Sequence, residues 1–305
     1  MKPPAVQPGA RIALISPASF AIDERVELGT TALSRLGFVP ELAANARARG
    51  PLYFAGTVEE RLADLHAAFT CDADLVMCLR GGYGSNYLLD ALDLELIAAH
   101  PKPFFAYSDL TGVQLHLLDK LGLPAFHGPM AAADFYLEGG VHLKSFRAAI
   151  EGRPYSVGTD EGLRTLRSGT ARGTLVGGCL SILVTLLGTP WEPRTEGRLL
   201  FLEDVGEKPY RIDRMLWQMR KAGKFEGVTG IVFGEMLGCS TNDAEREMLE
   251  QAILYALDGI SVPIGFGLRS GHVSRQNVTL TFGVEAELKL EAEARLTFRE
   301  AAVTA

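Results

Sequence analysis

A single serine, Ser108, stands where an apolar run passes into a helical pattern. The stretch from Lys102 to Leu118 reads KPFFAYSDLTGVQLHLL, so the serine follows a strand pattern and precedes a helix. Serine is a common helix N-cap, because its side chain accepts hydrogen bonds from free backbone N–H groups. It can also be a nucleophile, because a sharp strand-to-helix turn lifts a hydroxyl above the sheet edge beside unpaired N–H donors. This stretch alone leaves both interpretations open.

A nucleophilic serine needs a base and a group that orients the base. Two histidines are candidates for the base: His127 ends the run PAFHG, and His272 lies in the loop LRSGHVSRQN. Two acids, Glu203 and Asp204, directly follow the apolar run LLFL, where a strand would end. The G-x-S-x-G elbow is not matched around the serine, which disfavours an ordinary α/β-hydrolase.

A glycine-rich loop follows a second apolar run. It reads LRGGYGSN over residues 79–86 and contains Gly81, Gly82 and Gly84. Glycines let backbone N–H groups approach a ligand without obstruction by side chains. The loop matches neither common nucleotide-binding fingerprint. It is therefore either a simple turn or a site where backbone groups meet a small ligand.

Composition limits the classes of function that these residues can serve. The chain has 305 residues, of which 47% are hydrophobic and 22% are charged, with a formal net charge of −7. This composition is typical of a globular protein of one or two domains. The negative charge and the lack of a Lys/Arg run disfavour nucleic acid as a partner.

Cysteine and histidine spacing gives no sign of a metal site. The four cysteines, Cys71, Cys78, Cys179 and Cys239, form no C-x-x-C pair. They are typical of small buried residues in a reducing compartment. No H-E-x-x-H motif occurs, so we expect neither a metal nor a cofactor. The stretch MKPPAVQPGARIALISPAS fits neither a signal peptide nor a membrane span, so we expect a cytoplasmic protein that binds no membrane.

The elements that must position these residues fall into two regions. Over residues 11–130 short apolar runs alternate with helical patterns, which predicts a parallel sheet with helices on both faces. One helix is expected over residues 23–36. Another begins with a capping box, Thr57 followed by Glu60. This first domain, residues 1–150, carries Ser108.

The second region is separated from the first by a polar stretch rich in Gly and Thr. We interpret residues 151–170 as an interdomain linker and residues 171–305 as a second domain. That domain has strand patterns at GRLLFLED and GIVFGEM and helical patterns at YRIDRMLWQMRKAG and over residues 242–257. The tail over residues 286–298 alternates apolar and polar residues, which predicts antiparallel strands with one solvent-exposed face.

Four motifs in this order carry a resemblance to a known family. They are Arg80-Gly81-Gly82-Tyr83-Gly84, Tyr107-Ser108-Asp109-Leu110-Thr111, Leu202-Glu203-Asp204 and Gly271-His272. Over nearly its whole length the chain resembles the LD-carboxypeptidase family of serine peptidases. The family contains enzymes that remove the terminal D-alanine from cytoplasmic murein tetrapeptides in peptidoglycan recycling. It also contains relatives that cleave peptidyl or aminoacyl nucleotides and confer self-immunity.

The resemblance implies a catalytic triad of Ser108, Glu203 and His272, with the nucleophile in the first domain and the other two residues in the second. It also implies a flavodoxin-like N-terminal domain, a smaller mixed β/α C-terminal domain and a homodimer. Two departures from the family pattern concern the cleft wall. Cys179 stands where the family often has asparagine, and residues 280–283 read LTFG instead of L-P-x-G.

A serine carboxypeptidase also needs an oxyanion hole and a group that binds the free carboxylate. We expect the backbone N–H groups of Gly82 and Asp109 to hold the oxyanion, with glycine required at position 82 because a side chain there would obstruct the serine. We expect Arg80 or Arg269 to bind the carboxylate beside Gly81.

Three functions are compatible with these observations. The first is the murein tetrapeptide carboxypeptidase, and the second is the same triad acting on peptidyl or aminoacyl nucleotides. The short loop LGCSTND over residues 237–243 offers no obvious aromatic platform for a base. The third is a two-domain protein that binds a small ligand without catalysis and uses its serine only as a cap.

Overall fold

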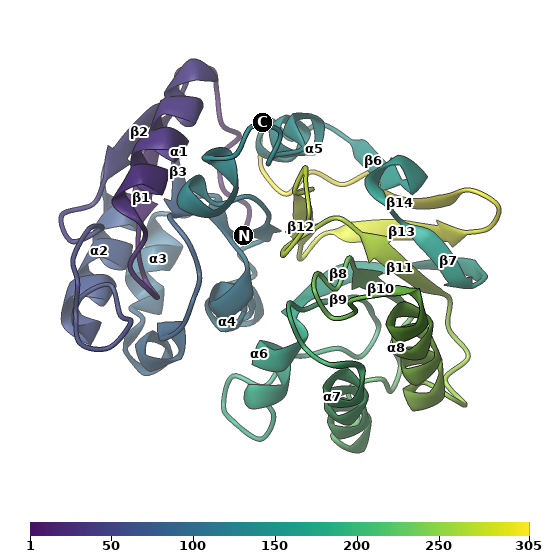
Figure 1. The fold of residues 1–305 in the computed structure, drawn as a ribbon. Coiled ribbons are helices and arrows are strands. Elements are labelled where there is room, and N and C mark those ends of the chain that lie inside the picture. Colours follow the sequence, from purple (N-terminus) through teal and green to yellow (C-terminus); the bar gives the residue numbers. More distant parts are fainter. Residues whose placement is uncertain (305) are drawn as a thin grey trace.

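Two β-sheets lie side by side in the computed structural model, which describes residues 1–304 (Figure 1). The first sheet has six strands in the order β12-β5-β4-β3-β1-β2. Its strands are β1 (Arg11–Ile15), β2 (Val39–Leu42), β3 (Leu75–Cys78), β4 (Phe104–Ala106), β5 (Ala125–His127) and β12 (Leu280–Phe282). Strands β1 to β5 are parallel, and β12 pairs antiparallel with β5. The predicted parallel sheet is confirmed, and the order 2-1-3-4-5 is that of flavodoxin-like folds.

Helices cover this sheet on both faces. They are α1 (Asp23–Arg35), α2 (Val58–Thr70), α3 (Leu94–Ala99), α4 (Thr111–Leu121) and α5 (Leu143–Ile150). The predicted capping box is confirmed, because Thr57 accepts from the Glu60 N–H and the Glu60 carboxylate accepts from the Thr57 N–H. The segment after the glycine loop forms two short helices, the 3₁₀ helix η1 (Ser85–Ala91) and α3. Asp93 causes the break, because its carboxylate caps α3 by accepting from the Leu96 N–H.

The second sheet has eight strands in the order β6-β14-β13-β8-β9-β10-β11-β7. They are β6 (Tyr155–Gly158), β7 (Arg164–Arg167), β8 (Gly169–Cys179), β9 (Arg198–Glu203), β10 (Gly230–Gly234), β11 (Ile264–Leu268), β13 (Glu285–Leu290) and β14 (Ala294–Phe298). The four central strands, β8 to β11, are parallel, and the flanking strands are antiparallel. The tail forms the predicted antiparallel pair, β13 with β14.

The domain boundaries differ from those expected from composition. The segment 151–170 contributes β6 and β7, which form the two opposite edges of the second sheet, so it is not a separate linker. Edge strands carry only one row of ladder hydrogen bonds, and their polar residues therefore hide the strand pattern. Strand β12 comes from the C-terminal region but joins the first sheet. The sheet that the C-terminal region contributes to has eight strands, against six in the first sheet.

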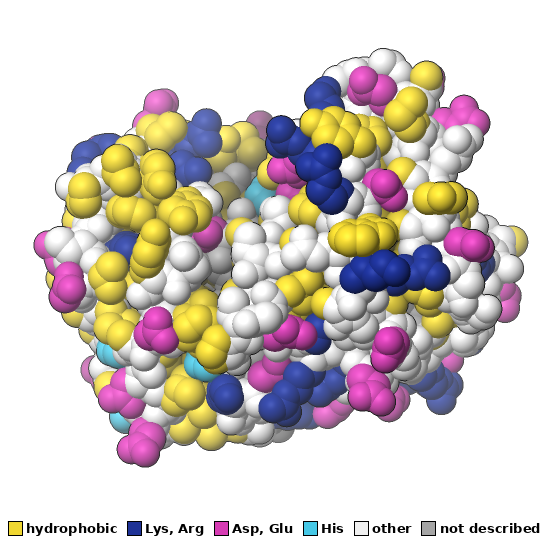
Figure 2. Space-filling view, turned by 90° about the horizontal axis from the view of Figure 1, so that it is seen from below, with side chains coloured by type: hydrophobic (Ala, Val, Ile, Leu, Met, Phe, Trp, Pro, Cys, Tyr) yellow, Lys and Arg dark blue, Asp and Glu magenta, His cyan; other side chains and the backbone are white. Residues whose placement is uncertain are grey.

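Three helices, α6 (Leu180–Thr185), α7 (Pro209–Lys221) and α8 (Asp243–Ala256), lie beside the second sheet (Figure 1). The helix predicted at YRIDRMLWQMRKAG is confirmed as α7, in which Ile212, Leu216 and Met219 are buried and Met215 is half-buried. Within residues 1–304, no helix combines the length and the apolar character needed to cross a bilayer. Basic and acidic side chains are interspersed over the face shown in Figure 2.

Candidate active site

Ser108 occupies a strained turn between β4 and the short 3₁₀ helix η2 (Ser108–Leu110). Its φ is +64°, in the left-handed region, which costs a residue other than glycine about 1–2 kcal/mol. The residues that cap η2 and α4 are Tyr107 and Leu110, and neither helix has a side-chain cap. The interpretation of Ser108 as an N-cap is therefore wrong. Backbone strain held at a half-buried hydroxyl is typical of functional sites.

The glycine-rich loop packs directly against this serine. A Cβ added at Gly81 would lie 2.9 Å from the Ser108 Cβ and 3.1 Å from its Oγ. A Cβ added at Gly82, whose φ is +116°, would instead lie 2.4 Å from the Oγ of Ser19. The residue that must be glycine beside the nucleophile is thus Gly81. The expectation that a side chain at position 82 would obstruct Ser108 is wrong, because position 82 faces Ser19.

Two backbone N–H groups near Ser108 are free to bind a ligand. Within residues 1–304, the N–H groups of Gly82 and Asp109 donate to no protein acceptor. Both groups adjoin Ser108, since Asp109 follows it in the chain and Gly82 lines the same cavity. An oxyanion hole needs free backbone donors of this kind beside the nucleophile.

His272 and Glu203 form a hydrogen-bonded pair. The Nδ1 of His272 lies 2.8 Å from the Oε2 of Glu203, and the His272 backbone N–H donates to the same oxygen at 3.1 Å. Glu203 ends β9, one of the four central parallel strands, and His272 lies in the loop between β11 and β12. The carboxyl group is fully buried, and a Cβ at Gly271 would lie 2.6 Å from its Cδ. Glycine at 271 therefore leaves the space that the carboxylate fills.

The structure distinguishes between the two acids and between the two histidines. Asp204 accepts from the backbone N–H groups of Ser181 and Val205, so it holds the start of α6 and does not bond to His272. His127 ends β5, is fully buried and stacks on Phe282, with neither ring nitrogen hydrogen-bonded to protein. Burial lowers the pKa of His127 to about 4, so the ring is neutral.

Burial and the neighbouring charge act in opposite directions on the Glu203–His272 pair. Burial alone would lower the pKa of His272, but the adjacent carboxylate more than offsets this, and the pKa lies above its ordinary value of 6.5. Burial alone would raise the pKa of Glu203, but the imidazolium and its hydrogen bond hold that pKa below 4.5. The acid is thus ionised and oriented to stabilise a proton on the imidazole.

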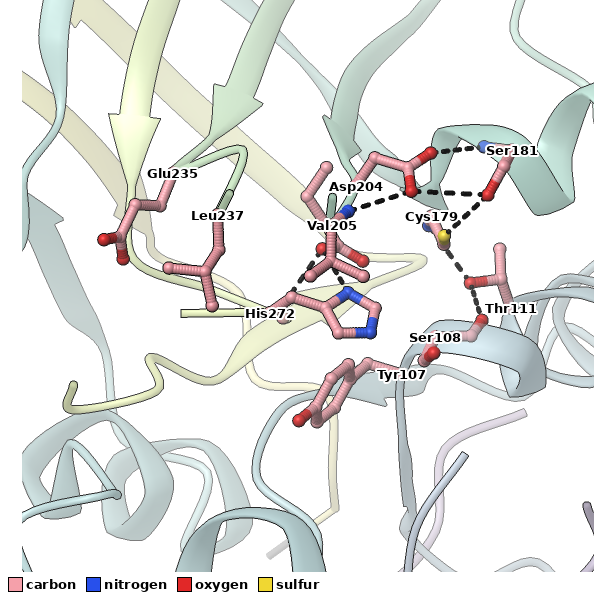
Figure 3. A network of polar contacts seen from close by, with 12 residues as sticks. Tyr107, Ser108, Thr111, Cys179, Ser181, Asp204, Val205, Glu235, Leu237 and His272 are labelled. Carbon is pink, nitrogen blue, oxygen red and sulfur yellow. Dashed lines mark hydrogen bonds and ion pairs between the residues drawn. The ribbon is translucent and has the colours of Figure 1, made fainter. Parts of the chain in front are cut away.

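Ser108 and His272 line one cavity of about 160 Å³. Figure 3 shows His272, Tyr107 and Ser108 together, with the second ring nitrogen of the imidazole on the side of Ser108. The ring of Tyr107 packs edge-on against the imidazole, with 5.1 Å between the centroids. The structure therefore brings together a strained serine, an imidazole and a buried carboxylate from both halves of the chain.

Two arginines line the same cavity. Arg80 was expected there, and Arg25, from α1, joins it. The Arg25 guanidinium lies over the ring of Tyr136, 4.7 Å from its centroid. Nothing in the spacing around Arg25 indicates this position, because only the packing of α1 brings it to the cavity. Arg269, the other expected carboxylate ligand, instead donates to the backbone oxygen of Asp160 at 2.6 Å and does not line the cavity.

Comparison with known proteins identifies similar chains over most of the length. Residues 12–128 match the model of the LD-carboxypeptidase N-terminal domain, and residues 172–288 match that of the C-terminal domain. The murein tetrapeptide carboxypeptidase of Pseudomonas aeruginosa is 35% identical, with 92% of this chain and 93% of that protein covered. The microcin C7 self-immunity protein MccF of Escherichia coli is 26% identical, with coverages of 90% and 88%.

A solved structure shows the same fold. The crystal structure of muramoyltetrapeptide carboxypeptidase from Oxalobacter formigenes superposes with a TM-score of 0.84. It is 30% identical in sequence, and the match covers 96% of this chain and 100% of that one. The two-sheet architecture described above is therefore shared with a solved relative.

Proposed function

We propose, since the chain belongs to the LD-carboxypeptidase family of serine peptidases, that it hydrolyses the amide between an L-centre and the terminal D-alanine of a murein tetrapeptide. The chain is a serine-type hydrolase by its family. The observation that best supports the substrate is the pair of arginines beside Ser108, because an exopeptidase must bind a free carboxylate. A cytoplasmic location stays a prediction from the sequence, and a homodimer stays a prediction from the resemblance.

The proposed mechanism uses Ser108, His272 and Glu203 in sequence. The Nε2 of His272 takes the proton of the Ser108 hydroxyl while the oxygen attacks the amide carbonyl. Glu203 holds the Nδ1–H tautomer and stabilises the imidazolium. The imidazolium then protonates the leaving amine, D-alanine departs, and water hydrolyses the acyl-enzyme with the same histidine as base. The N–H groups of Gly82 and Asp109 hold the oxyanion of each tetrahedral intermediate.

Incubation of the pure protein with murein tetrapeptide tests the proposal. We expect release of free D-alanine and the corresponding tripeptide, detected by mass spectrometry. A diastereomeric peptide ending in L-alanine serves as the matched control and should remain intact. If the tetrapeptide also remains intact, the assignment of this substrate is wrong.

The second candidate is the cleavage of an aminoacyl or peptidyl nucleotide. It is favoured by the similarity to the microcin C7 self-immunity protein MccF. Both activities would use the same triad, so the leaving group distinguishes them. Assay of an aminoacyl sulfamoyl adenosine beside the tetrapeptide separates the two, because only the second candidate predicts release of a nucleoside product.

The acid limb of the pH profile follows from the raised pKa of His272. The imidazole must be neutral to accept the serine proton, so we expect kcat/KM to fall as the pH drops, with a midpoint above 6.5. In Glu203→Gln the carboxylate charge is gone, and the midpoint of the residual activity should move to lower pH. A wild-type profile that stays flat down to pH 5.5 would contradict the role of His272.

Substitution of the cavity arginines should weaken binding of the free carboxylate. We expect Arg80→Met and Arg25→Met each to lower kcat/KM by about 10- to 100-fold, the loss of one charge-assisted hydrogen bond. On a substrate with an amidated C-terminus the same variants should match wild type. Arg153→Met, which removes an exposed arginine paired with Glu151, is the control. Equal losses on both substrates would show that neither arginine binds the carboxylate.

A further inference from the structure

Asp134 is a buried carboxylate beside the site that the mechanism above does not use. It belongs to the π-helical turn η3 (Ala131–Phe135) and is only 5% exposed. Its Oδ2 accepts from the Met130 backbone N–H at 2.8 Å, and its Oδ1 accepts from the Nδ2 of Asn277 at 3.0 Å. The hydroxyl of Tyr107 makes a longer contact with Oδ1, at 3.5 Å. One carboxylate therefore contacts its own turn and two segments that are distant from it in the sequence.

Asn277 connects this carboxylate to the loop that carries His272. Its Oδ1 accepts from the Gly271 N–H, and its Nδ2 donates to the Gly271 carbonyl, both at 3.0 Å. Gly271 directly precedes His272, so the amide fixes the backbone from which the imidazole projects. Asn277 is fully buried, and its own backbone N–H donates to Gly140 at 2.7 Å. The His272 loop is thus held to the first region of the chain by side-chain bonds.

Tyr107 connects the same carboxylate to the serine turn. Tyr107 directly precedes Ser108, and its ring packs edge-on against the imidazole of His272. Ser108 and His272 lie on different regions of the chain, so contacts between these regions set the position of one relative to the other. Asp134 is the group that is bonded to both sides, on one through Tyr107 and on the other through Asn277.

We propose that Asp134 is a positioning residue that holds the His272 loop against the Ser108 turn through Asn277 and Tyr107. The inference rests on the proposed function, since it assigns the bond network a role in aligning base and nucleophile. A misplacement of about 1 Å can lower the rate of an enzyme by about 100-fold. Loss of this carboxylate should therefore lower turnover more than substrate binding.

The protonation state of Asp134 affects the stability of the protein, so the pH at which variants are compared matters. Burial raises the pKa of Asp134 from 3.8 to about 6, partly offset by its hydrogen bonds, so its contribution to folding is lost as the pH rises through about 6. At pH 8 the buried charge is a cost to stability. The charged and titratable groups that face it are Tyr107 and His272, and its charge raises the pKa of His272.

The test compares Asp134→Asn with a matched control, Asp64→Asn. Asp64 is also a buried carboxylate that accepts from the amide and backbone of an asparagine, Asn45, but it lies away from the cavity. We expect Asp134→Asn to lower kcat by about 10- to 100-fold with KM within about twofold. At pH 8 its Tm should stay within about 4 °C of wild type. Asp64→Asn should keep kcat within about twofold.

A second variant and a substrate-free readout complete the test. In Asp134→Asn/Asn277→Asp the amide and carboxylate exchange places, and kcat should recover relative to Asn277→Asp alone. The rate at which a fluorophosphonate labels Ser108 should rank the variants in the same order as kcat does. That rate needs no peptide, so it tests Asp134 even if the tetrapeptide is not the substrate. Equal kcat and labelling rates in Asp134→Asn and Asp64→Asn, or a loss of kcat explained by the unfolded fraction, would overturn the proposal.

Discussion

Ser108→Ala should lower the release of D-alanine by about 10⁴-fold or more, the largest effect expected of any single substitution in this chain. Without the hydroxyl no acyl-enzyme can form, and only binding and the oxyanion hole remain to assist water. The fold should persist, because the Ser108 side chain caps neither adjoining helix. Steady-state kinetics and thermal unfolding of the purified variant measure the two effects.

Ser108→Gly is the matched control for strain at this position. It removes the same hydroxyl, and glycine adopts the φ of +64° without a steric cost. We expect it to be as inactive as Ser108→Ala but more stable by about 1 kcal/mol, the cost of a left-handed residue with a Cβ. Activity within tenfold of wild type in either variant would exclude Ser108 as the nucleophile.

Glu203→Ala should also give a large loss, about 10⁴-fold in kcat, because the imidazolium loses its buried counter-charge. Glu203→Gln should be less harmful, at about 10²- to 10³-fold. The Oε2 atom accepts both the Nδ1–H and the backbone N–H of His272, whereas Oε1 has no hydrogen-bond partner among residues 1–304. The amide oxygen of glutamine can therefore take the place of Oε2 and preserve the tautomer while the charge is lost.

Asp204→Asn is the matched control for the acid. Asp204 adjoins Glu203 and is also buried, but it bonds to the backbone at the start of α6. We expect it to cost stability and leave kcat within about tenfold of wild type. If Glu203→Ala and Asp204→Asn lowered kcat equally, the carboxylate at 203 would have no special relation to His272.

Local patterns predicted much of this fold because the interactions that form it are themselves local. The capping box at Thr57 and Glu60 joins residues three apart, and the apolar stripe of α7 repeats within one helix. The alternation of strand and helix patterns predicted the parallel sheet, although its strands pair over long sequence distances, because few other folds are compatible with such alternation. Residues 151–170 were misassigned because β6 and β7 are edge strands, where neighbours distant in sequence decide the structure.

Some residues of the candidate site are indicated by local sequence, and others are brought there only by tertiary packing. Ser108 and its glycine loop can be recognised in short stretches, one a strand-to-helix turn and the other a cluster of glycines, and the family motifs added Glu203 and His272. Arg25 and Asp134 carry no local signal. Asp134 accepts a hydrogen bond from Asn277, which is 143 residues away in the sequence. Arg25 reaches the cavity only through the packing of α1. Such contacts depend on tertiary structure that no short stretch of sequence encodes.

Covalent labelling tests most directly whether folding assembles a working nucleophile at position 108. Wild-type protein is treated with a fluorophosphonate, digested and analysed by peptide mass spectrometry, beside His272→Ala. We predict one adduct, on the peptide that contains Ser108, and its near absence in the variant. An adduct on another residue, or equal labelling with and without His272, would contradict the account.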